Sequence, residues 1–337
     1  MTDTVERIAI EDAIDLVRTA FQANGVREDD AQIVASALVH AEAEGQSGHG
    51  FSRIEDYISQ VRSGKINAAA EVRTQLTSTT ALRTDADGGF AFPALQEVIA
   101  QGVAVARAHG TATMSVYNSH HCGVLASHVE QVAEQGLICM MVANAPKAIA
   151  PWGAKTPVFG TNPIAFAAPR QGKPPLVIDL SLSKVARGKV MNAKKLGKDI
   201  PEGWAIDVDG QPTTDAEAAL SGSMLPIGDA KGTALALMVE VLATCFAGGT
   251  FSSEAGSFFN ATGKQPRVGQ FLMAISPESS PDFFERIDQL LDAIAALDGT
   301  RLPGQRRLAA RAAAMKDGLL VPRHYLDSAR VLCQATG

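Results

Sequence analysis

A histidine and an arginine lie four residues apart in a glycine-rich segment, residues 44–53 (EGQSGHGFSR). Glycines on both sides of His49 let the backbone approach a ligand closely. Arg53 carries a planar guanidinium whose geometry matches a carboxylate. An imidazole beside such an anion site is suited to donate a proton to a C=N or C=O group that is being reduced. From the residues alone, a solvated loop whose histidine caps a helix is the alternative interpretation.

A second polar segment, residues 118–123 (NSHHCG), follows an expected strand and precedes an expected helix. Free N–H groups at the start of a helix can bind an anion such as a pyrophosphate. Together with His128, the pair His120 and His121 also allows a metal site as an alternative. No carboxylate accompanies these histidines at a familiar ligand spacing, so we predict no metal site.

Further polar residues stand at the ends of expected strands. Residues 160–163 (GTNP) form a tight turn that enters a strand, and their types alone indicate a plain turn. Asp179 closes another strand and could bond a ribose or a catalytic group, or equally cap a helix. Ala230 and Lys231 form one basic cluster, and the run 301–307 (RLPGQRR) forms another. The run could bind a 2′-phosphate, although a charge run is more often solvated surface.

Alternating helical and extended patterns must position these residues. Apolar residues recur at helical spacing from Ile10 to Phe21 and from Ile33 to Ala41, and Gly25 and Gly45 follow as stop signals. Further helices are expected over 93–110, 231–247 and 281–297, with a basic, alanine-rich helical tail. Buried strands are expected over 111–118, 137–144, 163–169, 175–181 and 268–276.

These elements predict an α/β fold. The strands are too irregularly spaced for a simple βαβ series, so we expect a mixed sheet and a helical domain built from both chain ends. A single doubly wound domain is the alternative. The expected division is an N-terminal helical region over residues 1–75, joined by residues 281–337, then a first central region over 76–120 and a central domain over 121–280 that binds cofactor and substrate. The Rossmann fingerprint G-x-G-x-x-G is absent, so a nicotinamide cofactor needs a non-Rossmann site.

Composition narrows the location and the partners. The 337 residues carry a formal net charge of −6, which argues against nucleic acid and anionic membranes as partners. The four cysteines form no C-x-x-C pair, which favours reduced thiols. The N-terminus has no apolar signal segment. The sequence also contains no uncharged stretch of about 20 apolar residues, so we expect no membrane span. We therefore expect a cytoplasmic protein.

Taken together, several segments resemble the type-2 malate/lactate dehydrogenase-like oxidoreductases, a non-Rossmann family. The resemblance covers nearly the whole chain, and its most specific segment is FGTNPIAFAAP within residues 151–170. The other segments are 44–53, 85–94, 118–123, 179–190, 201–215, 225–242 and 301–307.

Within this family the chain is most similar to the Δ1-piperideine-2-carboxylate/Δ1-pyrroline-2-carboxylate reductases. The resemblance implies reduction of a cyclic 2-imino acid to L-pipecolate or L-proline with NADPH, or with NADH. It also implies a homodimer with its active site near the subunit interface. An apolar wall from residues 256–260 would suit a ring.

The resemblance also implies roles for individual residues. His49 matches the proton donor, Arg53 the carboxylate anchor and Thr161 a substrate contact, while in some relatives His120 or its neighbour has the acid/base role. Ser47 is a candidate to orient His49, because Gly48 and Lys189 stand where relatives have a serine and a relay aspartate. The residues implied for cofactor binding are His120, His121, Cys122, Gly123, Val124, Ile178, Asp179, Leu180, Ala230, Lys231, Arg301, Gly304, Arg306 and Arg307.

Other functions remain open from the sequence. The same fold could oxidise malate, lactate, sulfolactate or ureidoglycolate. A metal-dependent hydrolase or lyase using His120, His121 and His128 is an alternative of another class. A ligand-binding protein without turnover is a third.

Overall fold

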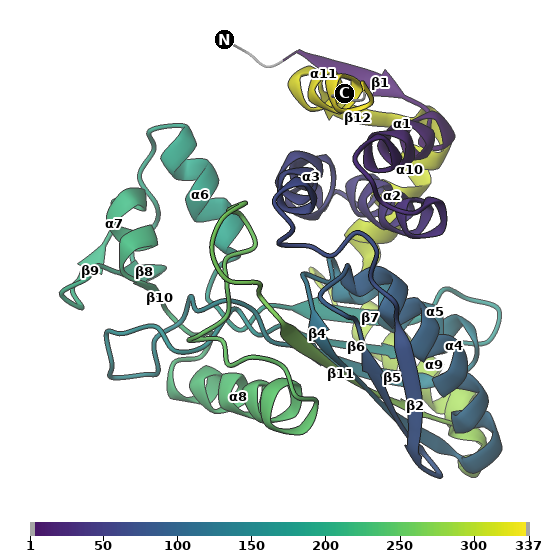
Figure 1. Cartoon of the computed structure of the whole chain (residues 1–337). Coiled ribbons are helices and arrows are strands. Elements are labelled where there is room, and N and C mark those ends of the chain that lie inside the picture. The colour runs from purple at the N-terminus through teal and green to yellow at the C-terminus, as the bar shows by residue number, and fades with distance from the viewer. Residues whose placement is uncertain (1–3, 335–337) are drawn as a thin grey trace.

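A seven-stranded mixed sheet forms the centre of the computed structural model, which describes residues 4–334 (Figure 1). In spatial order its strands are β2 (Arg73–Ser78), β3 (Ala81–Asp85), β4 (Thr111–Ser119), β11 (Val268–Ile275), β5 (Ile138–Ala143), β6 (Ile164–Ala168) and β7 (Leu176–Leu180). Only β3 and β4 pair in parallel, and β11 lies between β4 and β5 although it is the last of the seven in sequence. The predicted α/β fold with a mixed sheet is confirmed.

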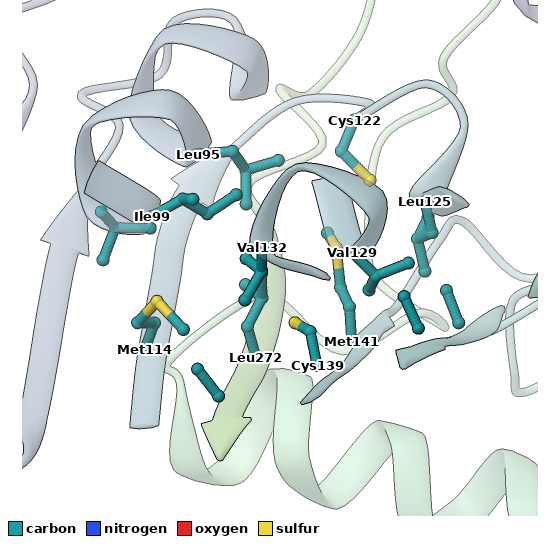
Figure 2. Close-up of a cluster of buried hydrophobic side chains, with 14 of the residues drawn as sticks. Leu95, Ile99, Met114, Cys122, Leu125, Val129, Val132, Cys139, Met141 and Leu272 are labelled. Atoms are coloured by element: carbon teal, nitrogen blue, oxygen red, sulfur yellow. The ribbon is translucent and has the colours of Figure 1, made fainter. Parts of the chain in front are cut away.

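Helices cover both faces of this sheet. On one face α4 (Ala91–His109) and α5 (Leu125–Glu134) pack on the buried cluster shown in Figure 2, where Leu272 meets side chains from both helices. On the other face α8 (Ala230–Glu240) continues into the π-helical turn η3 (Val241–Phe246). Phe271 joins the core on that side, as the alternation of side chains along a strand requires.

A helical layer is built from both ends of the chain. Its helices are α1 (Ile10–Ala23), α2 (Glu28–Ala43), α3 (Ile54–Arg62), α10 (Gln305–Asp317) and α11 (Arg323–Leu332). The strands β1 (Val5–Ile8) and β12 (Leu319–Pro322) pair antiparallel and fasten the two ends together. Val17, Leu38, Ile58 and Leu326 share one buried cluster. No residue of α9 (Phe283–Ala295) belongs to it, so the C-terminal contribution to the cluster comes from α10 onward.

A small lobe packs beside the main sheet and was not expected from the sequence. Its sheet has strands β8 (Ala205–Ile206), β9 (Pro212–Thr213) and β10 (Ser223–Met224), flanked by α6 (Arg187–Lys195) and α7 (Ala216–Ser221). Ile200 and Met224 are buried in a hydrophobic cluster that also contains residues of α8. A short 3-10 turn, η4 (Pro277–Ser279), follows β11. Among the described residues, no helix has the length and apolar character needed to cross a membrane.

Candidate active site

The segment 44–53 folds into two 3-10 turns, η1 (Ser47–His49) and η2 (Phe51–Arg53), between α2 and α3. Glu42 accepts a hydrogen bond from the Phe51 amide at 2.9 Å and lies against Gly50. A Cβ at Gly50 would stand 2.2 Å from a Glu42 carboxylate oxygen, so a larger residue there would displace the Glu42 side chain. The Ser52 hydroxyl closes the turn on the Ser47 carbonyl. This tight turn places His49 next to His121, which follows strand β4.

Three histidines from two distant segments meet here, and we call His49, His120 and His121 the histidine cluster. The rings of His49 and His121 stack with centroids 5.1 Å apart. The Tyr57 hydroxyl lies 2.5 Å from His121 Nδ1. Phe258 packs on both His120 and His121, at centroid distances of 5.3 and 5.0 Å. Two of the segments predicted to carry chemistry are therefore brought together.

Arg53 lies next to this cluster with some of its hydrogen-bonding capacity unused. Its Nε donates to the Gly48 carbonyl at 2.7 Å, and its guanidinium lies 4.5 Å from the centroid of the Phe259 ring. Arg53 forms an ion pair with Asp56 in which the oxygen lies 3.8 Å from Nη1, beyond hydrogen-bond length. Nη1 is buried without a hydrogen-bond partner, which is costly unless a ligand supplies an acceptor. A carboxylate would do so.

Burial makes the histidines neutral. Desolvation lowers the pKa of His49 to about 4, and the nearby Arg53 charge contributes to this lowering. Desolvation, then the charges of Lys65 and Arg53, lower the pKa of His120 to about 3. The pKa of His121 is also lowered well below its usual value by burial. Near pH 7 the cluster therefore offers proton acceptors, not imidazolium donors.

Two neutral side chains orient the cluster, and neither was predicted from the sequence. Tyr57 contacts His121, and the buried Gln60 amide lies 3.0 Å from His120 Nε2. Arg53 immediately precedes α3, and Tyr57 and Gln60 follow it at i+4 and i+7, so the three residues lie on one side of this helical segment. That spacing of polar residues within an amphipathic helix was the available signal. No hydrogen bond joins Ser47 to His49 Nδ1, which has no partner.

The turn that holds Thr161 is fixed by a buried network outside the contacts of the histidine cluster. Asn162 adopts a left-handed φ of 38° and donates to Glu240 Oε2 at 2.9 Å. Glu240 Oε1 accepts from the Ser252 amide at 2.7 Å. The Thr161 carbonyl accepts from Leu182. Ala230 and the exposed Lys231 begin α8 beyond this network.

Asp179 caps helix α5 from a neighbouring strand. Its carboxylate accepts from the Ala126 amide at 2.8 Å, in the first turn of α5. Of the two roles expected for Asp179, the helix cap is therefore observed. The residue keeps an exposed surface, but protein surrounds its carboxylate, and this desolvation raises the pKa of Asp179 to about 6. Ile178 and Leu180 flank it on the edge strand β7.

The arginines of the run 301–307 differ in environment. Arg307 is buried and pairs with Glu130 at 2.7 Å and with Glu44 at 2.8 Å. Arg311 joins the same two carboxylates. Arg301 and Arg306 are exposed, and within residues 4–334 neither forms an ion pair. Gly304, with φ of 81°, lies against the Val177 carbonyl of β7.

The loop 120–124 runs from β4 into α5. Gly123 has φ of 68°, and a Cβ there would stand 2.8 Å from the Phe92 ring. His128 bonds the Cys122 carbonyl at 2.9 Å instead of joining His120 and His121. Within residues 4–334 no group of three histidine, cysteine or acidic side chains is arranged to hold a metal ion.

Comparison with known proteins defines the class. Residues 8–328 match the model of the malate/L-lactate dehydrogenase family, so the chain belongs to that family of oxidoreductases, and the family predicted from the sequence is confirmed. A (2R)-3-sulfolactate dehydrogenase (NADP(+)) of Chromohalobacter salexigens is 47% identical, over 96% of this chain and 97% of the relative. A Δ1-pyrroline-2-carboxylate/Δ1-piperideine-2-carboxylate reductase of Pseudomonas putida is 38% identical, over 98% of both chains. The crystal structure of the Δ1-piperideine-2-carboxylate reductase of Pseudomonas syringae superposes with a TM-score of 0.92 at 36% identity, covering 97% of this chain and 99% of the other.

Proposed function

We propose that the protein is an NADP(H)-dependent oxidoreductase that acts on the carbon next to the carboxylate of a small acid. One observation carries this proposal. The buried Arg53 Nη1, which has no hydrogen-bond partner, lies beside a cluster of neutral histidines. A carboxylate on Arg53 would place the adjacent carbon within the reach of an imidazole that can exchange a proton with it.

Some of the described residues fit an NADP cofactor. The exposed guanidinium groups of Arg301 and Arg306 beside β7 suit a 2′-phosphate, and Lys231 offers a further cation. Arg307 is already paired, and Asp179 already uses an amide at the start of α5. We assign the remaining contacts to residues 120–124, Ile178, Leu180 and Ala230. The bound nicotinamide supplies or accepts the hydride.

The first candidate substrate is (2R)-3-sulfolactate. The relative that is 47% identical is named for it. Oxidation of a 2-hydroxy acid requires a base for the hydroxyl proton, and His49 and His120 are bases near pH 7 because burial lowers both pKa values. Arg53 would hold the carboxylate while the imidazole accepts the proton.

A cyclic 2-imino acid is the second candidate, favoured by a specific feature of the site. Phe258 and Phe259 form an aromatic wall over the histidine cluster and Arg53, and such a wall suits a ring. A protonated imine carries its own proton, so neutral histidines are sufficient. Relatives named as reductases of such imines are 34–38% identical to this chain.

The decisive assay offers both substrate classes to the purified protein. NADP⁺ is supplied with (2R)-3-sulfolactate, malate or lactate, and NADPH with freshly generated Δ1-pyrroline-2-carboxylate or Δ1-piperideine-2-carboxylate. Turnover that depends on Arg53 and His49, tested with Arg53→Met and His49→Ala, supports the proposed function. Turnover of the imines alone selects the second candidate. No turnover of any of these acids with either nicotinamide contradicts the function, and loss of activity on chelation would favour a metal enzyme.

We also propose that the chain forms a homodimer. α8 and η3 expose an apolar face that includes Leu237, Met238, Val241 and Phe246. A second copy of the chain would remove this surface from water. A dimer mass by light scattering that becomes monomeric in Leu237→Glu/Val241→Glu supports this assignment, whereas a monomeric wild type contradicts it.

A further inference from the structure

The orientation of the Gln60 amide can be assigned from its own contacts. Gln60 is fully buried near the end of α3. One end of its amide lies 2.9 Å from the Phe258 carbonyl and 3.1 Å from the Asp56 carbonyl. Carbonyl oxygens only accept, so this end must be the NH2 group. The other end, 3.0 Å from His120 Nε2, is therefore the oxygen.

This assignment fixes the tautomer of His120. An oxygen acceptor at Nε2 requires that Nε2 carry the proton. The ring is neutral because burial lowers its pKa to about 3, so Nδ1 carries only its lone pair. His120 is 1% exposed, and its Nδ1 is buried without any hydrogen-bond partner. A buried acceptor that the protein leaves unused is costly unless a ligand satisfies it.

We propose that Gln60 is a positioning residue, which holds His120 as the Nε2–H tautomer so that Nδ1 accepts a hydrogen bond from the substrate's O–H or N–H group. The proposal rests on the proposed function for the identity of that donor. A hydroxy acid and a protonated cyclic imine both present such a donor beside their carboxylate. A 2-oxo acid presents only a carbonyl oxygen, which Nδ1 in this tautomer cannot bind.

The Gln60 amide contacts both His120 and the loop that carries the aromatic wall, so it affects the tautomer and the position of the wall together. Gln60 holds the Phe258 main chain, and Ser63 donates to the Ala261 carbonyl at 2.7 Å. Lys65 donates to the carbonyls of Ser257, Asn260 and Thr262. These three side chains, from one stretch of chain, fasten the loop 257–262 over the histidine cluster. The titratable groups near the His120 ring are Tyr57, His121, Arg53 and Lys65.

The test reads the tautomer directly by long-range ¹H–¹⁵N correlation of the ¹⁵N-histidine-labelled full chain, with His120→Asn assigning the signals. At pH 7 wild-type His120 should show a protonated Nε2 and a bare Nδ1. Gln60→Met removes the acceptor and should give a mixture of tautomers, with kcat lowered about tenfold or more. Ser63→Ala is the matched control, because it removes a contact to the same loop but none to His120. It should alter KM and leave the tautomer unchanged.

Gln60→Glu keeps an acceptor at Nε2 and adds a negative charge. It should retain the Nε2–H tautomer and move the acidic limb of the kcat/KM profile to higher pH, because a carboxylate favours the imidazolium. A wild-type Nδ1–H tautomer overturns the proposal, and so does a tautomer that Gln60→Met leaves unchanged. The two tautomer measurements, on wild type and on Gln60→Met, need no substrate, so an enzyme inactive on all the acids above contradicts the proposed function without deciding the tautomer.

Discussion

The rings of His49 and His121 stack nearly parallel, with an interplanar angle of 11° and centroids 5.1 Å apart. His49 comes from the turn after α2, in the helical layer, and His121 comes from the loop after β4 of the sheet. The stack therefore joins two regions of the fold through two neutral rings. A charge on either ring would be placed beside Arg53 in a desolvated site, and the site is consequently sensitive to acid.

We predict that acid destabilises the fold between pH 6.5 and 4. The pKa values of His49 and His120 are lowered from 6.5 to about 4 and about 3. Because both are depressed in the folded state, the unfolded chain binds more protons in this window, and stability falls as pH falls through it. From pH 7 to 5 each histidine should cost about 2 kcal/mol, measured by urea unfolding.

His120→Asn should reduce this pH dependence. The control is His109→Asn, because His109 is exposed at the end of α4. Equal slopes of unfolding free energy against pH in wild type and His120→Asn would contradict the prediction.

Two substitutions of Arg53 test whether substrate binding needs only a positive charge or also the planar guanidinium. Arg53→Lys keeps a cation but loses the planar fork and the bond from Nε to the Gly48 carbonyl. We expect KM for the acid substrate to rise about tenfold or more in Arg53→Lys and further in Arg53→Met, since a hydrogen bond to a charged group contributes about 1.5–3 kcal/mol. Steady-state kinetics measure this, with KM for NADPH as the internal control. An unchanged KM for the acid would show that Arg53 does not bind the substrate.

Tyr57→Phe removes a single hydroxyl, the one that contacts His121 Nδ1. The lost hydrogen bond leaves a buried ring nitrogen unsatisfied, so the free energy of unfolding should fall by about 1–3 kcal/mol. Thermal and urea unfolding measure the change. A Tyr57→Phe variant as stable as wild type would show that the hydrogen bond to His121 does not contribute to stability.

Substitutions of the neighbouring Arg306 and Arg307 should affect different properties, cofactor binding for Arg306 and stability for Arg307. Arg307→Met leaves the two buried carboxylates of Glu44 and Glu130 with Arg311 as their shared cation, and it should destabilise the protein by about 3 kcal/mol. Arg306→Ala should leave stability unchanged and raise KM for NADPH more than KM for NADH. Comparing unfolding and both Michaelis constants tests this, and a cofactor defect in a stably folded Arg307→Met would reverse the assignment.

Much of the fold was predictable because its buried strands are short apolar runs between turn residues. The bounds of β4, β5, β6, β7 and β11 all lie within one residue of the expected ranges. The position of β11 was not predictable, since the sequence pattern does not encode which distant strand pairs with which. The small lobe was missed because its strands have two residues each, too few for an alternating pattern.

The candidate site was predictable only in its separate pieces. The glycines around His49 and the HHCG run marked residues able to do chemistry, but their meeting depends on how the helical layer sits against the sheet. Nothing in the sequence indicates that Arg307 is buried and Arg306 exposed, because both belong to the same basic run. Gln60 was missed because its helical spacing from Arg53 and Tyr57 does not indicate that its side chain is buried.

The position of β11 late in the sequence affects how the sheet can form during synthesis of the chain. This strand ends at residue 275 yet fills the gap between β4 and β5, and β12 completes the helical layer only at residue 322. During synthesis, β4 and β5 leave the ribosome with facing edges unpaired until more than a hundred further residues have followed. Exposed edges of this kind recruit other strands. The nascent chain therefore spends much of its translation with an open sheet, and chaperone binding during synthesis should matter more for its yield than the stability of the finished fold.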